Sequence, residues 1–338
     1  TPSTRYPSPG SSGAAAQLAR ALNPIARLAG IVLVLVAGVV SIKALLVVDL
    51  VVSLATLVLA QWLLQRRLLS LQPSGTWQLR LGEVSRFVGH MSLSQLLNAT
   101  SNPGALRLVV AKMFGLDEVA LFSFLQQLLL IARRFLPAVL LQNLVRPMLI
   151  TRLGAGDRIA VGAGFGLLWK LNVVAVLAAI VVTVVGGDAL LRTLSSGRFD
   201  HMTVVMLFLL LGLLSAAQGQ VISMALQVHG QASRVTRVSG LALLTMPAAI
   251  VGGALAALPG VAAGAAGAAW LRNVLGMHYL RRAGASVELD WRGVLRITFA
   301  FGATAMLGAL LARWAAPMIG LGCALAGLLL VLRLVRPL

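Results

Sequence analysis

Acidic residues are scarce in this sequence. Asp and Glu together number 9 in 338 residues, against 28 Lys and Arg, and charged residues of both signs make up 11% of the chain. An ordinary soluble domain is about 25% charged, so a globular protein of this length would need polar surface that this sequence does not contain. The scarcity also leaves no acid pair for glycosyl transfer. It provides few of the mid-membrane carboxylates that proton- or sodium-driven antiporters use.

Cysteine is almost absent. The single cysteine, Cys323, excludes a disulfide framework. The histidines have no metal-ligand spacing with one another or with Cys323, so we expect no metal and no cofactor. No nucleophile stands near a base, and we therefore expect a protein that is not an enzyme.

Apolar sequence is abundant. Hydrophobic residues make up 59% of the chain, and its mean hydropathy is +0.93. Because many apolar runs reach the roughly 20 residues that span a bilayer, we predict an all-α, polytopic transmembrane helix bundle of about ten spans. A membrane barrel would show short alternating segments instead. The predicted spans are 24–42, 44–64, 84–110, 117–150, 159–186, 202–228, 234–257, 259–280, 293–313 and 317–335.

The basic residues orient this predicted bundle. With a cytoplasmic N-terminus, the cytoplasmic loops hold most of the arginines, as the positive-inside rule requires, and both termini are then cytoplasmic. The opposite side holds only Lys43, Arg107, Lys112, Arg192, Arg198 and Arg313. This placement also argues against nucleic acid as a partner, despite a net charge of +19.

Two predicted helices are longer than a bilayer requires. Segment 84–110 is broken at Asn102–Pro103–Gly104, where proline removes a helical hydrogen bond. Segment 117–150 contains Arg133 and Arg134. If this segment were divided into two helices at the arginines, each helix would be too short to span a bilayer. We therefore expect one long tilted helix that places both arginines near mid-membrane.

Short joints predict antiparallel hairpins of neighbouring helices. Lys43 separates the first two spans, and Leu258–Pro259–Gly260 separates the seventh and eighth. Gly260 and Gly264 have the small-xxx-small spacing that lets helices approach closely. Among the acids, only Asp49 is expected within a span, and the others discussed, Asp188, Asp200, Glu288 and Asp290, are expected in solvated loops.

Arg133 and Arg134 need a polar environment within the membrane. A charged side chain at the bilayer centre costs at least about 2.5–3.5 kcal/mol, so such residues usually face a protein interior or a watery cavity. Adjacent residues point about 100° apart on a helix. Gln126 and Gln127 lie two turns before the arginines, each on the same side as its partner. The alternative is that the helix begins later and the arginines snorkel to the interface.

Other polar residues at predicted membrane depth form matching stripes. Asn98 belongs to one stripe and Gln220 to another, and Lys170 lies about 16 Å into its helix. Each stripe alone is typical of interhelical hydrogen bonding. Together with the cations Arg133, Arg134 and Lys170, these stripes predict a solvated lumen with a positive charge. Because guanidinium groups bind phosphate through two parallel hydrogen bonds, such a lumen suits a phosphate-bearing or otherwise acidic amphiphile. The predicted substrate-binding residues are Asn98, Gln126, Gln127, Arg133, Arg134, Lys170 and Gln220.

The stretch KMFGLDEVALFSFLQQLLLIARRFLPAVLLQNLVRPMLITRLGAGD resembles the central region of polysaccharide flippases in the multidrug/oligosaccharidyl-lipid/polysaccharide exporter superfamily. The features that carry the resemblance are Gly115, the pair Asp117–Glu118, a long helix from Val119, then Pro147, Arg152 and Gly156–Asp157. The hairpin, basic loop and broken helix before this stretch look like the family's fifth to seventh helices. The spans after them look like helices eight to fourteen.

The resemblance implies a two-lobe transporter of fourteen helices. Such a protein moves undecaprenyl-pyrophosphate-linked oligosaccharides across the bacterial inner membrane by alternating access, for lipopolysaccharide O-antigen synthesis. Its implied partners are this lipid-linked oligosaccharide, membrane lipids, and surface-polysaccharide polymerase and ligase machinery. Segment 1–22 is predicted to be flexible from its Pro, Ser and Gly content. The resemblance then implies the rest of the N-terminal lobe at 23–83, with two spans and a cytoplasmic loop, and the C-terminal lobe with additional helices at 84–338, with eight spans.

The family's first four helices have no counterpart in this sequence. We therefore expect the chain to be the later part of a longer protein. Two alternatives to a complete flippase stay open. One is a drug or small-molecule antiporter of the same superfamily, and the other is a truncated, inactive remnant.

Overall fold

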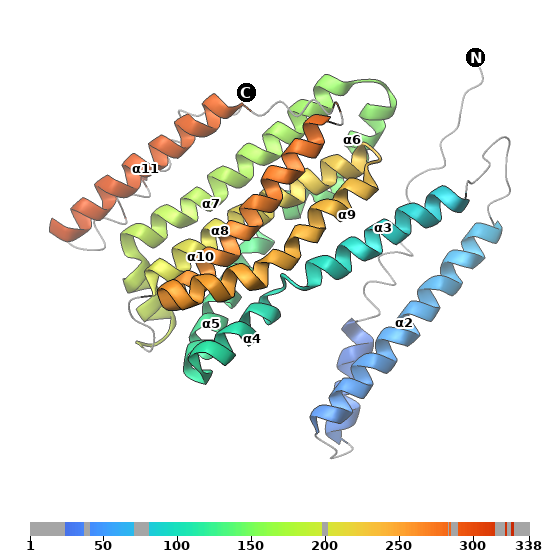
Figure 1. Ribbon diagram of the computed structural model, residues 1–338, viewed down its shortest axis with the longest axis horizontal. Coiled ribbons are helices and arrows are strands. Elements are labelled where there is room, and N and C mark those ends of the chain that lie inside the picture. The colour runs from blue at the N-terminus through green and yellow to red at the C-terminus, as the bar shows by residue number, and fades with distance from the viewer. Residues whose placement is uncertain are drawn as a thin grey trace. The chain divides into compact units, whose positions relative to one another are not determined.

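The chain is helical throughout its described part. The computed structural model describes residues 24–36, 41–70, 81–197, 202–282, 284, 290–314, 322 and 326–327. All regular structure in these residues is helical, which confirms the predicted all-α class for this part of the chain. The chain divides into two compact units, Thr1–Leu79 and Arg80–Leu338 (Figure 1). The predicted segment 1–22 and most of the predicted span 317–335 lie outside the described residues.

The first unit contains two helices in contact, Pro24–Val36 and α2 (Ile42–Ser70). Arg27 of the first helix forms an ion pair of 2.8 Å with Asp49 of α2. It also donates a hydrogen bond of 3.2 Å to the hydroxyl of Ser53. Since only a few residues separate two helices that touch, they are antiparallel neighbours, as the sequence predicts.

The joint between these helices lies earlier than predicted. The hydroxyl of Ser41 accepts a hydrogen bond of 3.1 Å from the backbone N–H of Ala44. A serine in this position caps a helix by satisfying one of its free N–H groups. Lys43, the predicted joint, therefore lies inside α2, because α2 begins at Ile42.

The second unit is a bundle built around α8. Its elements are α3 (Leu81–Ala99), α4 (Pro103–Phe114), α5 (Leu116–Arg134), α6 (Pro137–Gly154), α7 (Arg158–Leu194), α8 (Thr203–Val228), α9 (Ala232–Gly240), the 3₁₀ turn η1 (Leu241–Leu244), α10 (Thr245–Arg282) and α11 (Trp291–Trp314). Helix α8 contacts α5, α6, α7, α9 and α10. Helix α3 packs along α9, and α11 packs against α7 (Figure 1).

The predicted break at Asn102–Pro103–Gly104 is confirmed. Helix α3 ends at Ala99, and α4 begins at Pro103. Asn102 has an extended conformation (φ −66°, ψ 147°), which is the conformation that a following proline favours. Proline suits the first helical position because the N–H that it lacks would have no helical partner there.

The predicted single helix 117–150 is wrong. Helix α5 ends at Arg134 and α6 starts at Pro137, with Leu136 extended between them (φ −67°, ψ 134°). The reason is again proline, which disfavours helical geometry in the residue before it. The length argument missed this break because it required each helical piece to cross the bilayer alone. Arg133 and Arg134 consequently lie in the last turn of a helix, not in its middle.

Helix α7 extends past the end predicted for its span. Its backbone leaves helical geometry at Gly186 (φ −135°, ψ 17°) and the helix resumes to Leu194. Asp188, which was predicted in a loop, thus lies within the last turns of α7. Its carboxylate is exposed and accepts a hydrogen bond from the hydroxyl of Thr203, the first residue of α8.

Helix α10 reverses direction near its middle, as the predicted hairpin requires. The backbone is non-helical at Ala256 and Ala257, and Ala257 has a positive φ of 50°. The two limbs pack backbone to backbone. A Cβ atom on Gly260 would collide with the carbonyl oxygen of Gly252, and one on Gly264 would collide with that of Ala248. The predicted close contact at Gly260 and Gly264 is therefore confirmed.

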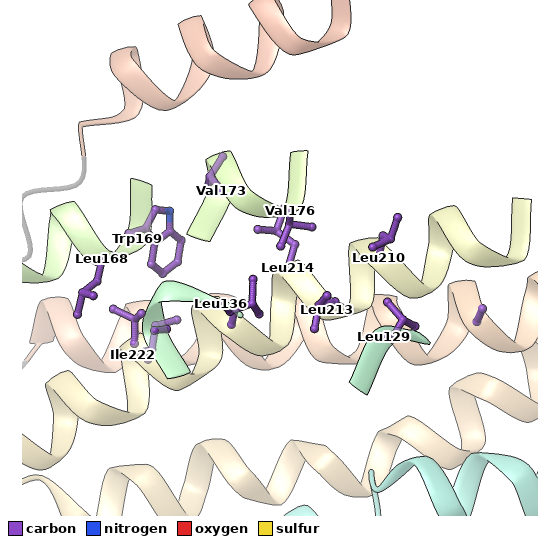
Figure 2. Packing of buried hydrophobic residues seen from close by; sticks show 14 of the residues in the cluster. Leu129, Leu136, Leu168, Trp169, Val173, Val176, Leu210, Leu213, Leu214 and Ile222 are labelled. Carbon is purple, nitrogen blue, oxygen red and sulfur yellow. The ribbon is translucent and has the colours of Figure 1, made fainter. Parts of the chain in front are cut away.

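One apolar core holds the second unit together. Buried Leu, Val, Phe, Ile and Ala side chains from α4 to α11 form a single cluster. Figure 2 shows Leu168, Trp169 and Val176 of α7 beside Leu214 and Ile222 of α8, with Leu129 of α5 and Leu136, just before α6, nearby. Helix α11 joins this core through Ile297 and Phe301, which are each 2% exposed.

The outer surface of the bundle is apolar too. Many large hydrophobic side chains are exposed, among them Phe299 at 75% and Leu255 at 82%. Among the described residues, four helical stretches are long and apolar enough to cross a membrane: Arg158–Leu194, Thr203–Val228, Ala232–Arg282 and Arg292–Leu311. These are the features of a membrane protein. The total of about ten spans stays a prediction.

Candidate cationic cavity

A cavity of about 190 Å³ lies in the second unit, among α4, α5, α8 and α10. Most of its wall is apolar, and it includes Leu106, Leu129, Phe208, Leu213 and several alanines of α10. Its polar residues are Ser101, Gln126, Arg133, Thr245 and Arg272. None of the described residues that line it is acidic. The cavity therefore combines an apolar wall with two guanidinium groups.

Arg133 reaches the cavity from the last turn of α5. A cation is favoured at this place because the carbonyl groups at the C-terminus of a helix carry partial negative charge. Within the described part of the chain, no hydrogen bond or ion pair engages its guanidinium. Arg133 is also exposed, so the cavity is open to the surroundings at this residue.

Arg272 comes from the second limb of α10 and is largely buried. Its guanidinium donates a hydrogen bond of 2.9 Å to the side-chain oxygen of Asn98 in α3. The amide nitrogen of Asn98 donates to the hydroxyl of Ser239 in α9 at 3.0 Å. That hydroxyl is 2.6 Å from the hydroxyl of Ser94. This polar chain fixes Arg272 against α3 and α9.

Arg133 and Arg272 both carry a positive charge beside the cavity, and like charges repel. One N–H of Arg272 is engaged by Asn98, and the described residues offer its guanidinium no further hydrogen-bond partner. Two like charges beside apolar side chains are unfavourable, since low local polarity strengthens electrostatic forces. An anion between them would remove that repulsion.

Gln126 lines the same cavity and is 4% exposed. Its side-chain oxygen accepts a hydrogen bond of 2.7 Å from Nε of Arg107 in α4. The sequence pattern predicts Arg107 on the outer side of the membrane. In the structure, this arginine lies within α4 and links that helix to α5.

The structure brings together part of the predicted binding set. Gln126 and Arg133 line the cavity, and Asn98 contacts it indirectly by holding Arg272. Arg134 and Gln127 are exposed and do not line it. The two arginines diverge because adjacent residues on a helix project about 100° apart.

Lys170 and Gln220 lie elsewhere, so the predicted residues do not share one lumen. The ammonium group of Lys170 pairs with a carboxylate oxygen of Asp290 at 2.9 Å, and this pair ties α7 to the start of α11. The amide of Gln220 donates to the side-chain oxygen of Gln142, which joins α8 to α6. Both are contacts between helices, and binding by any of the seven predicted residues stays a prediction.

Asp290 has a second role beyond this ion pair. Its other carboxylate oxygen accepts a hydrogen bond of 2.8 Å from the backbone N–H of Gly293. The pKa of Asp290 is lowered mainly by this N–H contact and, to a smaller extent, by the hydrogen bond and positive charge of Lys170. The aspartate was predicted in a solvated loop, and it is indeed half-exposed, but it is held at a helix start.

Arg272 and the role of Arg107 are not among the residues predicted from the sequence. Arg272 lies within the predicted span 259–280, where a lone charge in an apolar run is the signal that could have identified it. No sequence signal pairs Arg107 with Gln126, because the contact depends on how α4 folds back on α5. Among the described residues, no three His, Cys, Asp or Glu side chains come together to hold a metal ion.

Comparisons with known proteins do not extend this account. No family model, no curated protein and no solved structure matches the chain.

Proposed function

We propose that this protein binds the phosphate-bearing head group of an anionic lipid in the cationic cavity and moves that lipid across a membrane. Our preferred cargo is a lipid-pyrophosphate-linked oligosaccharide for cell-surface polysaccharide synthesis, carried by alternating access. In this proposal the protein is a transporter of the bacterial inner membrane with both termini cytoplasmic, and it catalyses no covalent step. The observation that carries the proposal is the placement of Arg133 and Arg272 in one largely apolar cavity.

The chemistry of the cavity suits a phosphate group on an apolar tail. Guanidinium groups stay charged at any physiological pH and bind phosphate oxygens through paired N–H donors. Among the described residues, the guanidinium of Arg133 has no hydrogen-bond partner and that of Arg272 has only Asn98. The leucine and alanine wall would pack against the first carbons of a lipid chain.

The size of the cavity limits what it holds. Its volume of about 190 Å³ is below the roughly 300–1,000 Å³ of usual ligand pockets. A head group fits in such a volume, whereas a whole lipid-linked oligosaccharide does not. In the proposed function the sugar and most of the lipid therefore lie outside the cavity, and Arg133 stands at the opening through which they would connect.

Breaks in the helices around the cavity provide places for movement. The break between α3 and α4 contributes Ser101 and Pro103 to the wall, and Arg133 lies just before the break between α5 and α6. Hinge residues are commonly a few positions in loops or at the ends of helices. We propose that these joints bend when access to the cavity alternates between the two membrane faces.

A drug or small-molecule antiporter of the same superfamily is the alternative. Proton or sodium coupling in that class normally uses carboxylates at membrane depth. The described lining of the cavity holds no carboxylate, which favours an anionic cargo over a cationic drug. A truncated, inactive remnant is the remaining alternative, and a transport measurement separates it from both.

The test is reconstitution of the full chain in vesicles with a fluorescent lipid-linked oligosaccharide. A reagent that quenches only the outer leaflet measures movement between leaflets. We expect Arg133→Gln and Arg272→Gln each to slow movement at least tenfold, because each removes a charged hydrogen bond to the phosphate. Arg134→Gln is the matched control, since it removes the same charge from a neighbour that does not line the cavity.

The control variant should move lipid at the unmodified rate. Equal rates for Arg133→Gln, Arg272→Gln and Arg134→Gln would refute the assignment of the cavity. No movement by the unmodified chain would refute the proposed function and leave the antiporter and the inactive remnant as the alternatives.

A further inference from the structure

Gln126 is a buried polar residue of the cavity, and its contact with Arg107 shows which way its side-chain amide is turned. Its side chain comes from the middle of α5, one helical face away from exposed Gln127. A glutamine amide presents either its oxygen or its nitrogen to a neighbour, and the two ends are nearly identical in shape. Which end faces the cavity therefore decides whether the cavity gains an acceptor or a donor.

Arg107 settles that orientation. An arginine Nε–H can only donate, so the atom of Gln126 that it contacts at 2.7 Å must be the amide oxygen. The amide nitrogen, with its two N–H groups, is the remaining polar end of a side chain that lines the cavity. Arg107 itself does not line the cavity. It acts through the amide that it holds.

Three of the five polar residues of the cavity then share one character. Arg133 and Arg272 can only donate hydrogen bonds, and Gln126 is fixed as a donor. The hydroxyl of Ser101 is already engaged with the backbone oxygen of Asn98, at 2.9 Å. An occupant that matches three donors and carries compensating charge is a group that has only acceptor oxygens.

We propose that Gln126, positioned by Arg107, is a specificity-determining ligand for the deprotonated oxygens of a pyrophosphate group. This inference rests on the proposed function, because it concerns the same cavity, and it adds the residue that selects an acceptor-only anion. A bound pyrophosphate accepts from both guanidinium groups and from the Gln126 amide. Arg107 is a positioning residue whose Nε–H keeps the amide from turning.

The substitution Gln126→Glu separates this role from a structural one. A glutamate keeps the size of the side chain and strengthens the link to Arg107, so a purely structural residue would tolerate it. It also replaces the donor with a carboxylate oxygen that faces the anion. The matched control is Gln127→Glu, which adds the same charge to the same helix one residue along, outside the cavity.

The experiment measures binding of two ligands to the full chain in detergent micelles by titration calorimetry. Inorganic pyrophosphate represents a free anion, and farnesyl pyrophosphate represents the same group on a lipid tail. We expect Gln126→Glu to weaken both ligands by roughly 100-fold, and Gln126→Leu by roughly 10-fold, since the latter only removes a donor to a charged group. Gln127→Glu should bind both as the unmodified chain does.

Arg107→Lys supplies a second, independent variant. It keeps the positive charge but loses the Nε–H that holds the amide, so we expect binding to weaken several-fold. A gain in affinity for farnesyl over inorganic pyrophosphate would assign the cavity to a lipid head group, and equal affinity would assign it to the pyrophosphate group alone. Either result agrees with a donor role for Gln126.

The inference is overturned if Gln126→Glu binds pyrophosphate as tightly as Gln127→Glu, or if the unmodified chain binds neither ligand. Should Gln126→Glu fail to give a monodisperse helical protein, the Arg107→Lys titration decides alone, and unchanged affinity there overturns the inference. Failure of the proposed function looks different. In that case the unmodified chain binds pyrophosphate with this dependence on Gln126 but moves no lipid in vesicles.

Discussion

The glycine-lined contact between the two limbs of α10 yields the sharpest stability prediction. In Gly264→Ala, the new Cβ would overlap the backbone carbonyl oxygen of Ala248 on the facing limb. A backbone oxygen cannot rotate away as a side chain can. Carbon and oxygen need about 3.3 Å between them, so the limbs would have to separate or one would have to shift along the other.

The expected magnitude follows from two opposing effects. Forcing extra atoms into a packed interior costs about 1–3 kcal/mol. Replacing glycine by alanine inside a helix recovers up to about 1 kcal/mol. Because the obstacle is backbone on a rigid limb, we expect the upper part of the range, with a net loss of about 2 kcal/mol.

The control is Gly267→Ala, on the same limb and less than one turn away. A Cβ at this glycine has no neighbour within 4 Å, so only the gain in helix propensity of up to about 1 kcal/mol should appear. Thermal unfolding of both variants in detergent, followed by circular dichroism, measures the difference. If Gly264→Ala unfolds at or above the temperature of Gly267→Ala, the close approach of the two limbs is refuted.

Two further predictions concern contacts outside the cavity. Folding lowers the pKa of Asp290, so its contribution to stability is present above the pKa of the unfolded aspartate, near 3.9, and is lost as pH falls through the lower folded value. Unfolding measured from pH 7 to pH 3 should therefore show a smaller loss of stability in Asp290→Asn than in the unmodified chain, and parallel curves would refute a folded-state role for this carboxylate. Gln220→Leu removes the partner of Gln142, which should cost about 1–3 kcal/mol of stability and leave pyrophosphate affinity unchanged. An affinity loss in titration, in protein that is still folded, would return Gln220 to the binding site.

Helix breaks were predictable where the sequence contains proline in a segment that is long for other reasons. The joint before Pro103 was identified correctly, but the equivalent joint before Pro137 was not. The difference lay in a length rule, which joined 117–150 because neither half could span a bilayer alone. Membrane helices packed in a bundle need not each span it, so the local effect of proline on Leu136 prevailed.

The cavity was only partly predictable for a related reason. Helical periodicity correctly placed Gln126 and Arg133 on one side of α5, since that relation is local. It could not tell which side faces the cavity, nor that Arg134 points elsewhere. Lys170 seemed unpaired because its partner, Asp290, lies 120 positions later in the chain. Tertiary packing sets such contacts, and periodicity along one helix does not report them.

The hydrogen-bonded chain from Arg272 to α3 has a consequence for biogenesis. Arg272 and Asn98 are 174 positions apart, and Ser94 and Ser239 are 145 apart, so this cluster cannot assemble until most of the chain has left the ribosome. Until then, Asn98 has a partner in its own helix, because its amide also donates to the backbone oxygen of Ser94 at 2.9 Å. The amide can thus enter the bilayer early with one of its bonds already made. Arg272 is synthesised later and enters a bundle that already contains its acceptor, the side-chain oxygen of Asn98.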